Sequence, residues 1–273
     1  MSVLVSSINE YLFCPLKLYL RHHLEFEKTE KKYSAKDNIL IFRQVYKDYN
    51  DIVRKNLRMV KKDMNASQIS EILFQDVNYL LKKSMQGYNF DSEKEKLLRL
   101  KQLENDLKVK NTILALKIHR ILDKTKNTSI QIVEMLFPPS LEGYLIRDKS
   151  LEIGGIVDRI EIIDGKYYPI SQKSKNPPLR GVWDSDALEI AAYALLVEQE
   201  FDTEVLVGFV DYQVLEDRRP VVVDSELREG LFIVLDDIRN IINYGNLPEV
   251  NINPKKCETC NYKEICDQNL EFS

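Results

Sequence analysis

Three cysteines stand close together in the segment KKCETCNYKEIC, and a fourth stands far away in YLFCPLKLYL. They are Cys257, Cys260, Cys266 and Cys14, and they account for every thiol in the sequence. Four thiolates suit either zinc in a tetrahedral site or an iron–sulfur cluster, and the spacing alone does not separate the two. The cysteines therefore predict a metal site that ties the first helix to the last segment.

A second group of residues has the chemistry to hydrolyse a phosphodiester bond. The segment LEIGGIVDRIEII places Gly154, Gly155 and Asp158 on one predicted strand, and the next predicted strand ends at Lys173. Carboxylates hold Mg²⁺ or Mn²⁺, which activates water and neutralises charge developing on the phosphate. A lysine beside that water stabilises the transition state. Taken alone, the glycine pair and the acid would equally suit a turn with an exposed carboxylate.

Two patterns of apolar residues divide the chain into the elements that must position these groups. Residues 7 to about 126 have helical periodicity, which is strongest over residues 93–124. After Asn127 the pattern predicts alternating strands and helices, with the segment FPPSLEG as a break. The expected strands cover 129–137, 151–163, 165–171, 204–216 and 218–223, and the expected helices cover 186–201 and 225–245. This order predicts an α/β core behind an N-terminal helical lobe.

The composition restricts where the protein works and what it binds. Of 273 residues, 30% are charged and 44% are hydrophobic, and the net charge is −4. No run of about 18 apolar residues is present, and the start of the chain lacks the features of a secretory signal. We therefore expect a cytoplasmic protein with no membrane segment, whose cysteines serve as ligands and not as disulfides. A nucleic-acid surface would have to be a local basic patch.

These motifs together resemble the RecB-like nucleases of the PD-(D/E)xK type, and among them the CRISPR-associated Cas-four exonucleases are most similar in size and plan. The resemblance covers Cys14 to about Leu24 and most of residues 112–266, and leaves a helical insertion at about 28–108 unexplained. It implies a RecB-like, restriction-endonuclease-type core, in which helices flank a central mixed sheet. The implied domains are a helical lobe at 1–128, a nuclease core at 129–246 and a C-terminal iron–sulfur clasp at 247–273.

The resemblance also implies cofactors, partners and a role. In that family the cysteines hold a 4Fe–4S cluster, and Mn²⁺ or Mg²⁺ serves the nuclease site. The implied function is an exonuclease of CRISPR adaptation. It would trim single-stranded or overhanging DNA ends before the integrase formed by the Cas-one and Cas-two proteins inserts them. Two alternatives stay open: a catalytically silent DNA-binding or adaptation subunit of the same fold, and a RecB-like DNA repair nuclease.

Further site residues follow from the same resemblance. His119, in ILALKIHRILDK, matches the helix histidine that completes the metal shell in the family, although Ala115 replaces the usual glycine. Glu189 and Tyr193 stand where relatives have a glutamine and a tyrosine on one helix face, with roles in active-site support and DNA contact. His119 would otherwise be a solvent-exposed histidine, and Tyr193 a core aromatic residue.

A basic loop, SQKSKNPPLRGVW, follows the second predicted strand of the site. Its residues Lys175, Arg180 and Trp183 have the chemistry to contact phosphates and to stack a base of single-stranded DNA. The same composition is also that of an ordinary proline-rich surface loop.

One position departs from the family pattern. Where relatives have an acid two residues before the lysine, this chain has Ser171, and a hydroxyl is a weak neutral ligand for a divalent cation. Either the site is silent, or the carboxylate has moved to the next helix, as it has in some restriction endonucleases of this superfamily. We expect Glu189 to supply it, with Asp158 and His119 completing the metal shell.

Overall fold

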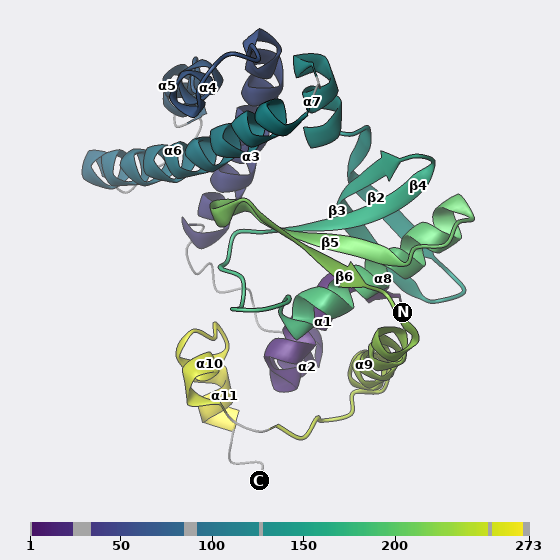
Figure 1. The fold of residues 1–273 in the computed structure, drawn as a ribbon. Helices are drawn as coiled ribbons and strands as arrows, with labels where there is room; N and C mark the ends of the chain where they lie inside the picture. Colours follow the sequence, from purple (N-terminus) through teal and green to yellow (C-terminus); the bar gives the residue numbers. More distant parts are fainter. Residues whose placement is uncertain (1, 24–33, 85–91, 126–127, 251–252, 270–273) are drawn as a thin grey trace.

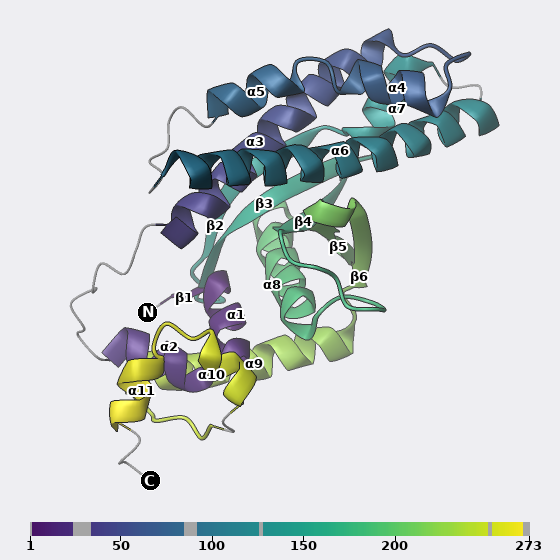
Figure 2. The ribbon, with the colours of Figure 1, turned by 90° about the vertical axis from the view of Figure 1, so that its left-hand side faces the viewer.

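The computed structural model describes residues 2–23, 34–84, 92–125, 128–250 and 253–269. A six-stranded mixed sheet stands at its centre, with helices on both sides (Figure 1 and Figure 2). The strands are β1 (Val3–Leu4), β2 (Ser140–Asp148), β3 (Ile153–Ile163), β4 (Lys166–Lys173), β5 (Val207–Tyr212) and β6 (Asp217–Val222). This arrangement confirms the predicted α/β class with a mixed sheet flanked by helices.

The order of the sheet is β1-β3-β4-β5-β6, and β2 pairs with β3 outside this path. β3 is antiparallel to β2 and β4, β4 is parallel to β5, and β5 is antiparallel to β6. The parallel pair β4–β5 requires a crossover connection. The crossover is the helix α8 (Asp184–Phe201), which packs on the sheet.

The remaining helices form two groups on opposite sides of the sheet (Figure 1 and Figure 2). One side carries α1 (Val5–Phe13), α2 (Pro15–His23), α8 and α9 (Ser225–Tyr244). The other carries α3 (Ser34–Asn56), the 3₁₀ turn η1 (Leu57–Met59), α4 (Ala66–Leu73), α5 (Val77–Ser84), α6 (Glu93–Lys124) and α7 (Ser129–Leu136). The short helices α10 (Pro254–Glu258) and α11 (Lys263–Asn269) lie beside α2.

Two separate clusters of buried apolar side chains match these two groups. The cluster around the sheet includes Val5, Ile8 and Leu18 from α1 and α2, while Ile132 of α7 belongs to the cluster of the helical lobe. The domain boundary at residue 128 stays a prediction. The helices α1 and α2 come before this boundary in the chain but pack with the sheet.

A buried lysine connects the helical lobe to the sheet. Lys110 of α6 is 4% exposed, and its Nζ lies 2.5 Å from the Oε1 of Glu216, which directly follows the 3₁₀ turn η3 (Gln213–Leu215) between β5 and β6. The same ammonium group lies over the rings of Tyr46 and Tyr49, 4.8 and 5.6 Å from their centroids. Pairing and cation–π contacts offset the burial of this charge.

Two elements differ from the sequence-based expectation. The segment 129–137 was expected to be a strand, and it is the helix α7. A capping box starts that helix, because Thr128 and Gln131 each accept a hydrogen bond from the other residue's backbone N–H. The expected break at FPPSLEG is also wrong in part, because β2 begins at Ser140 and continues through Gly143 at a φ of +60°.

None of the helices in the described part of the chain combines the length and the apolar character needed to cross a membrane.

Candidate functional site

The carboxylate of Glu189 lies against the end of strand β4. Ser171 donates a hydrogen bond from its Oγ to the Oε1 of Glu189 at 2.6 Å, and Lys173 donates from its Nζ to the Oε2 at 2.7 Å. Glu189 is 3% exposed and Ser171 is fully buried. Helix α8 thus brings a carboxylate to the side chain of Ser171, the position where the family pattern has an acid.

A third donor to this carboxylate comes from α1, where the Nδ2 of Asn9 donates to the Oε2 of Glu189. Burial raises the pKa of Glu189. The charge of Lys173 and hydrogen bonds from Lys173, Ser171 and Asn9 lower it, and the net pKa is below the ordinary value. The Glu189 carboxylate is therefore ionised at neutral pH.

Asp158 approaches the same part of β4 from β3. Its Oδ2 accepts a hydrogen bond from the backbone N–H of Gln172 at 2.8 Å. The β3–β4 ladder ends at the pair Arg159 and Ile170, and one further step of that register sets Asp158 opposite Ser171. Opposed residues in an antiparallel pair lie on one face of the sheet. Asp158 and Glu189 therefore contact adjacent residues of β4, although they belong to different elements.

Two glycines allow α1 and α8 to pack this closely on the sheet. A Cβ at Gly155 would lie 2.8 Å from the Cγ2 of Val5 and 3.3 Å from the Cε1 of Tyr193. A Cβ at Gly208 of β5 would lie 2.5 Å from the Cγ2 of Ile190. Tyr193 is 7% exposed and packs against β3 here, which is a position that suits support of the site.

Asp186, in the first turn of α8, is a fully buried carboxylate that sequence reasoning treated only as part of a helix start. Its Oδ1 lies 2.8 Å from the Nζ of Lys175 and 3.7 Å from the Nζ of Lys173. Tyr212 donates from its hydroxyl to the Oδ2 at 3.0 Å. Burial and this contact with Asp186 raise the pKa of Tyr212 to about 12, so the phenol stays protonated. In the sequence, this role was indicated only by the position of Asp186 three residues before Glu189, which places both carboxylates on one face of the helix.

The remaining residues expected in the metal shell and the DNA loop come from α6 and from the segment between β4 and α8. His119 is partly buried on α6. Within the described ranges, no three His, Cys, Asp or Glu side chains are grouped closely enough to hold a metal ion. Arg180 and Trp183 are exposed in the loop between β4 and α8, and Lys175 at its start pairs with Asp186. The metal shell and the roles of these residues stay predictions.

The cysteines come from two segments that lie side by side in the fold. Cys14 separates α1 from α2, and Cys257 lies in α10. Lys256 donates from its Nζ to the backbone oxygen of Leu12 at 3.0 Å, so α10 is held beside the end of α1 (Figure 2). All four thiols are partly exposed and none forms a disulfide.

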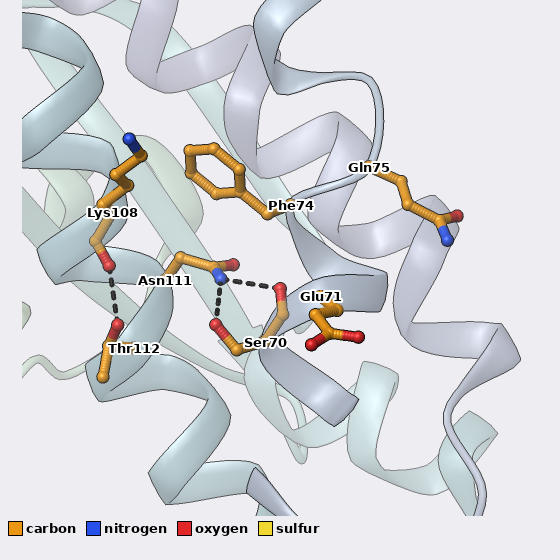
Figure 3. A pocket seen from close by; sticks show the side chains of 7 residues that line it. All are labelled: Ser70, Glu71, Phe74, Gln75, Lys108, Asn111 and Thr112. Atoms are coloured by element: carbon orange, nitrogen blue, oxygen red, sulfur yellow. Dashed lines mark hydrogen bonds between the residues drawn. The ribbon is translucent and has the colours of Figure 1, made fainter. Parts of the chain in front are cut away.

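A cavity of about 470 Å³ lies between α4 and α6, in the helical lobe and away from the site (Figure 3). Its most buried polar residue is Asn111, whose Nδ2 donates to the backbone oxygen and to the Oγ of Ser70, both at 2.8 Å. The Oδ1 of Asn111 accepts from the hydroxyl of Tyr49 at 3.0 Å. These hydrogen bonds are internal to the lobe, so the residues of the cavity hold α4 against α6.

Comparisons with known proteins agree with this geometry. The family model of the PD-(D/E)XK nuclease superfamily matches residues 2–267. A CRISPR-associated exonuclease Cas4/endonuclease Cas1 fusion from Leptospira interrogans serogroup Icterohaemorrhagiae serovar Lai (strain 56601) is 26% identical over 179 residues. These residues are 63% of this chain and 31% of the relative.

Two shorter relatives are similar as well. The CRISPR-associated exonuclease Cas4 of Francisella tularensis subsp. novicida (strain U112) is 28% identical over 45% of this chain and 60% of its own length. The CRISPR-associated exonuclease Cas4 of Thermoproteus tenax (strain ATCC 35583 / DSM 2078 / JCM 9277 / NBRC 100435 / Kra 1) is 27% identical over 45% of this chain and 64% of its own length. The chain therefore spans less than two thirds of the length of each of these relatives.

We expect Glu189 to stabilise the metal-free protein in a pH-dependent way. Because its pKa is lowered in the folded state, the stabilisation is fully present above the ordinary value of 4.5 and is lost as the pH falls through the folded pKa. Glu189→Gln should lower the free energy of unfolding by about 2 kcal/mol at neutral pH, as expected for hydrogen bonds to a charged group. The difference should shrink as the pH falls towards about 3, roughly one and a half units below the ordinary value of 4.5.

Urea unfolding in EDTA across this pH range measures the effect. Glu229→Gln, at an exposed position of α9, serves as the control and should change the free energy of unfolding by less than about 0.5 kcal/mol. A Glu189→Gln difference that is the same at both ends of the pH range would contradict the assignment.

Proposed function

We propose that this chain, which belongs to the PD-(D/E)XK nuclease superfamily, is a metal-dependent DNA exonuclease of the Cas4 type. One observation carries the proposal: the Glu189 carboxylate contacts Ser171 and Lys173, at the position where the usual acid is missing. A serine at that position was the reason to consider a silent site. A carboxylate from the neighbouring helix at that position supports an active site instead.

The proposed site combines two carboxylates and one lysine. Asp158 and Glu189 would hold Mn²⁺ or Mg²⁺, because hard cations in nucleases are bound by one or two carboxylates together with the substrate phosphate. When bound, the cation supplies an activated water and charge neutralisation at the phosphate. His119 is the third candidate ligand, and its placement on α6 leaves this assignment a prediction from the sequence.

Lys173 has a separate role in the proposal. Its ammonium group lies between two buried carboxylates, 2.7 Å from Glu189 and 3.7 Å from Asp186, which hold it in place. A fixed positive charge beside the reacting phosphate stabilises the transition state more than the ground state. Asp186 also pairs with Lys175, so α8 positions both lysines at the mouth of the site.

The biological role follows from the named relatives. Two of them are CRISPR-associated Cas4 exonucleases, and the third joins Cas4 to a Cas1 endonuclease in one chain. We place this protein in the same setting, where it would trim single-stranded or overhanging DNA ends before the integrase formed by the Cas-one and Cas-two proteins inserts them. Lys175, Arg180 and Trp183 are the residues proposed to contact that DNA.

An iron–sulfur cluster is the second part of the proposal. Four thiols, in α10, between α10 and α11, in α11 and at the α1–α2 junction, would provide the soft donor set of a 4Fe–4S cluster. The side chains of Lys17 and Lys256 lie over the ring of Phe13, 5.0 and 5.8 Å from its centroid. These cations, next to Cys14 and Cys257, would offset the negative charge of four thiolates. We propose that Cys14, Cys257, Cys260 and Cys266 hold the cluster.

Degradation of labelled single-stranded DNA in Mn²⁺ by anaerobically purified protein tests the nuclease. Asp158→Ala should abolish it. Lys173→Ala should lower kcat by about 10²-fold, as for loss of one donor to a developing anion, and should leave DNA affinity nearly unchanged because its role lies in the transition state. Asp164→Asn, in the exposed turn between β3 and β4, is the control and should cut at the wild-type rate. Full activity in Asp158→Ala would show that the site is elsewhere.

Removal of one thiol tests the cluster. Cys14→Ser should eliminate the brown colour, the bound iron and the sulfide of anaerobically purified protein, and should lower Tm because the cluster crosslinks distant parts of the chain. Iron and sulfide analysis, absorbance and thermal unfolding measure these effects. Stoichiometric zinc without iron or sulfide in the wild-type protein would contradict the proposal.

A further inference from the structure

The loop at residues 174–183, between β4 and α8, ends in an exposed apolar tip. Leu179 is fully exposed, at 102% of the reference value. The chain turns back at Gly181, which has a φ of +62°, and a Cβ at this glycine would have no neighbour within 4 Å. The tip of the loop therefore projects into open space, with a leucine at its end.

Hydrogen bonds from strand β6 fix the backbone of this tip. Arg219 of β6 donates from its Nη1 to the backbone oxygens of Pro178 and Gly181, at 2.7 and 2.5 Å, on either side of Leu179. The Nε of Arg219 donates to the Oδ2 of Asp217 at 2.9 Å, which fixes the guanidinium group.

The base of the loop is closed as well, because the Nε1 of Trp183 donates to the backbone oxygen of Asn176 at 3.0 Å. The backbone on both sides of Leu179 is therefore fixed while its side chain stays in water, and burial of this side chain against a partner would be favourable.

The charge of the region favours nucleic acid as the contact. Residues 166–183 contain no Asp or Glu, although the whole chain has a net charge of −4. Near the loop the segment carries three cations, Lys173, Lys175 and Arg180, of which the two lysines pair with Glu189 and Asp186 of α8. The exposed Arg180 directly follows Leu179, and a cation beside an apolar side chain fits a phosphate backbone with bases beside it.

The strand spacing of the sheet gives the distance between Arg219, which holds the tip, and Ser171 in the site. Ser171 is paired with Val210 on β5, and Val210 is paired with Arg219 on β6. Two strand spacings separate the Cα atoms of Ser171 and Arg219, which is about 10 Å. One strand of a DNA duplex advances 3.4 Å per nucleotide, so the span from Ser171 to the anchor of the loop corresponds to about three nucleotides.

We infer that Leu179 is a wedge that separates the terminal base pairs of duplex DNA, so that one strand enters the site. The inference rests on the proposed function only in taking DNA as the substrate. Proteins insert apolar side chains such as leucine between base steps to unstack them, at a cost of a few kcal/mol for each step. Trp183, 46% exposed at the other end of the loop, offers a ring on which a released base can stack. With this wedge, the substrates would include base-paired DNA ends as well as single strands.

Fluorescence of 2-aminopurine measures the opening directly and without cleavage. The probe is placed at each of the last four base pairs of a blunt duplex, and the protein is added in EDTA at concentrations that saturate the DNA by anisotropy. Wild-type protein should raise the fluorescence, and Leu179→Ala should remove most of the increase. Leu206→Ala is the control. Leu206 is also an exposed leucine, 56% accessible, but it precedes the first residue of β5, whereas the last residue of β5 pairs with Lys173 at the start of the loop. It should behave as the wild type does.

Cleavage in Mn²⁺ provides the second arm. Leu179→Ala should cut blunt duplex ends about tenfold more slowly, since 1.36 kcal/mol of lost unstacking energy is a factor of ten. It should cut single strands at the wild-type rate. A protein that cuts no DNA would refute the proposed nuclease, while the fluorescence would still report on the wedge. Wild-type protein that gives no fluorescence increase, or Leu179→Ala that gives the full increase, overturns the wedge and leaves Leu179 for contact with another protein.

Discussion

The rest of the site depends on the hydrogen bonds that the buried carboxylate of Glu189 accepts. Donors from two other elements meet at this one group: Asn9 of α1, and Ser171 and Lys173 of β4. A buried charge is stable only when it is paired and hydrogen-bonded, so these contacts favour the observed position of α8 against α1 and β4. The same contacts give β4, which lacks the usual acid, a carboxylate next to its lysine.

A chain of polar contacts extends from this carboxylate to the edge of the sheet. Lys173 lies between Glu189 and Asp186, and Asp186 accepts a hydrogen bond from Tyr212. The guanidinium group of Arg219 lies 5.7 Å from the centroid of the Tyr212 ring, and it holds the loop that carries Leu179. The lysine of the site and the exposed loop are therefore positioned by one connected network. A substitution at Asp186 or Tyr212 is expected to affect both.

The sequence predicted the parts of this arrangement that depend on local pattern. Strand β3 with its glycine pair was predicted because it is rich in β-branched residues, and helix α8 because its apolar run is too long for a strand. Residues 129–137 were misassigned because a short apolar run fits strand or helix equally well, and tertiary packing of Ile132 decided for the helix. The contact of Asn9 with Glu189 joins residues 180 positions apart, and no local signal marks such a pair. The buried role of Asp186 and the anchoring role of Arg219 were missed for the same reason.

The most direct test of the account is to return the carboxylate to its usual strand. Cleavage of single-stranded DNA in Mn²⁺ is measured for wild-type protein, Glu189→Gln, Ser171→Glu and the combination of both changes. If Glu189 supplies the acid that Ser171 lacks, Glu189→Gln is inactive and the combined variant recovers part of the activity, because a glutamate on β4 lies beside the same lysine. Wild-type cleavage by Glu189→Gln, or no cleavage by the wild-type protein, would contradict the account.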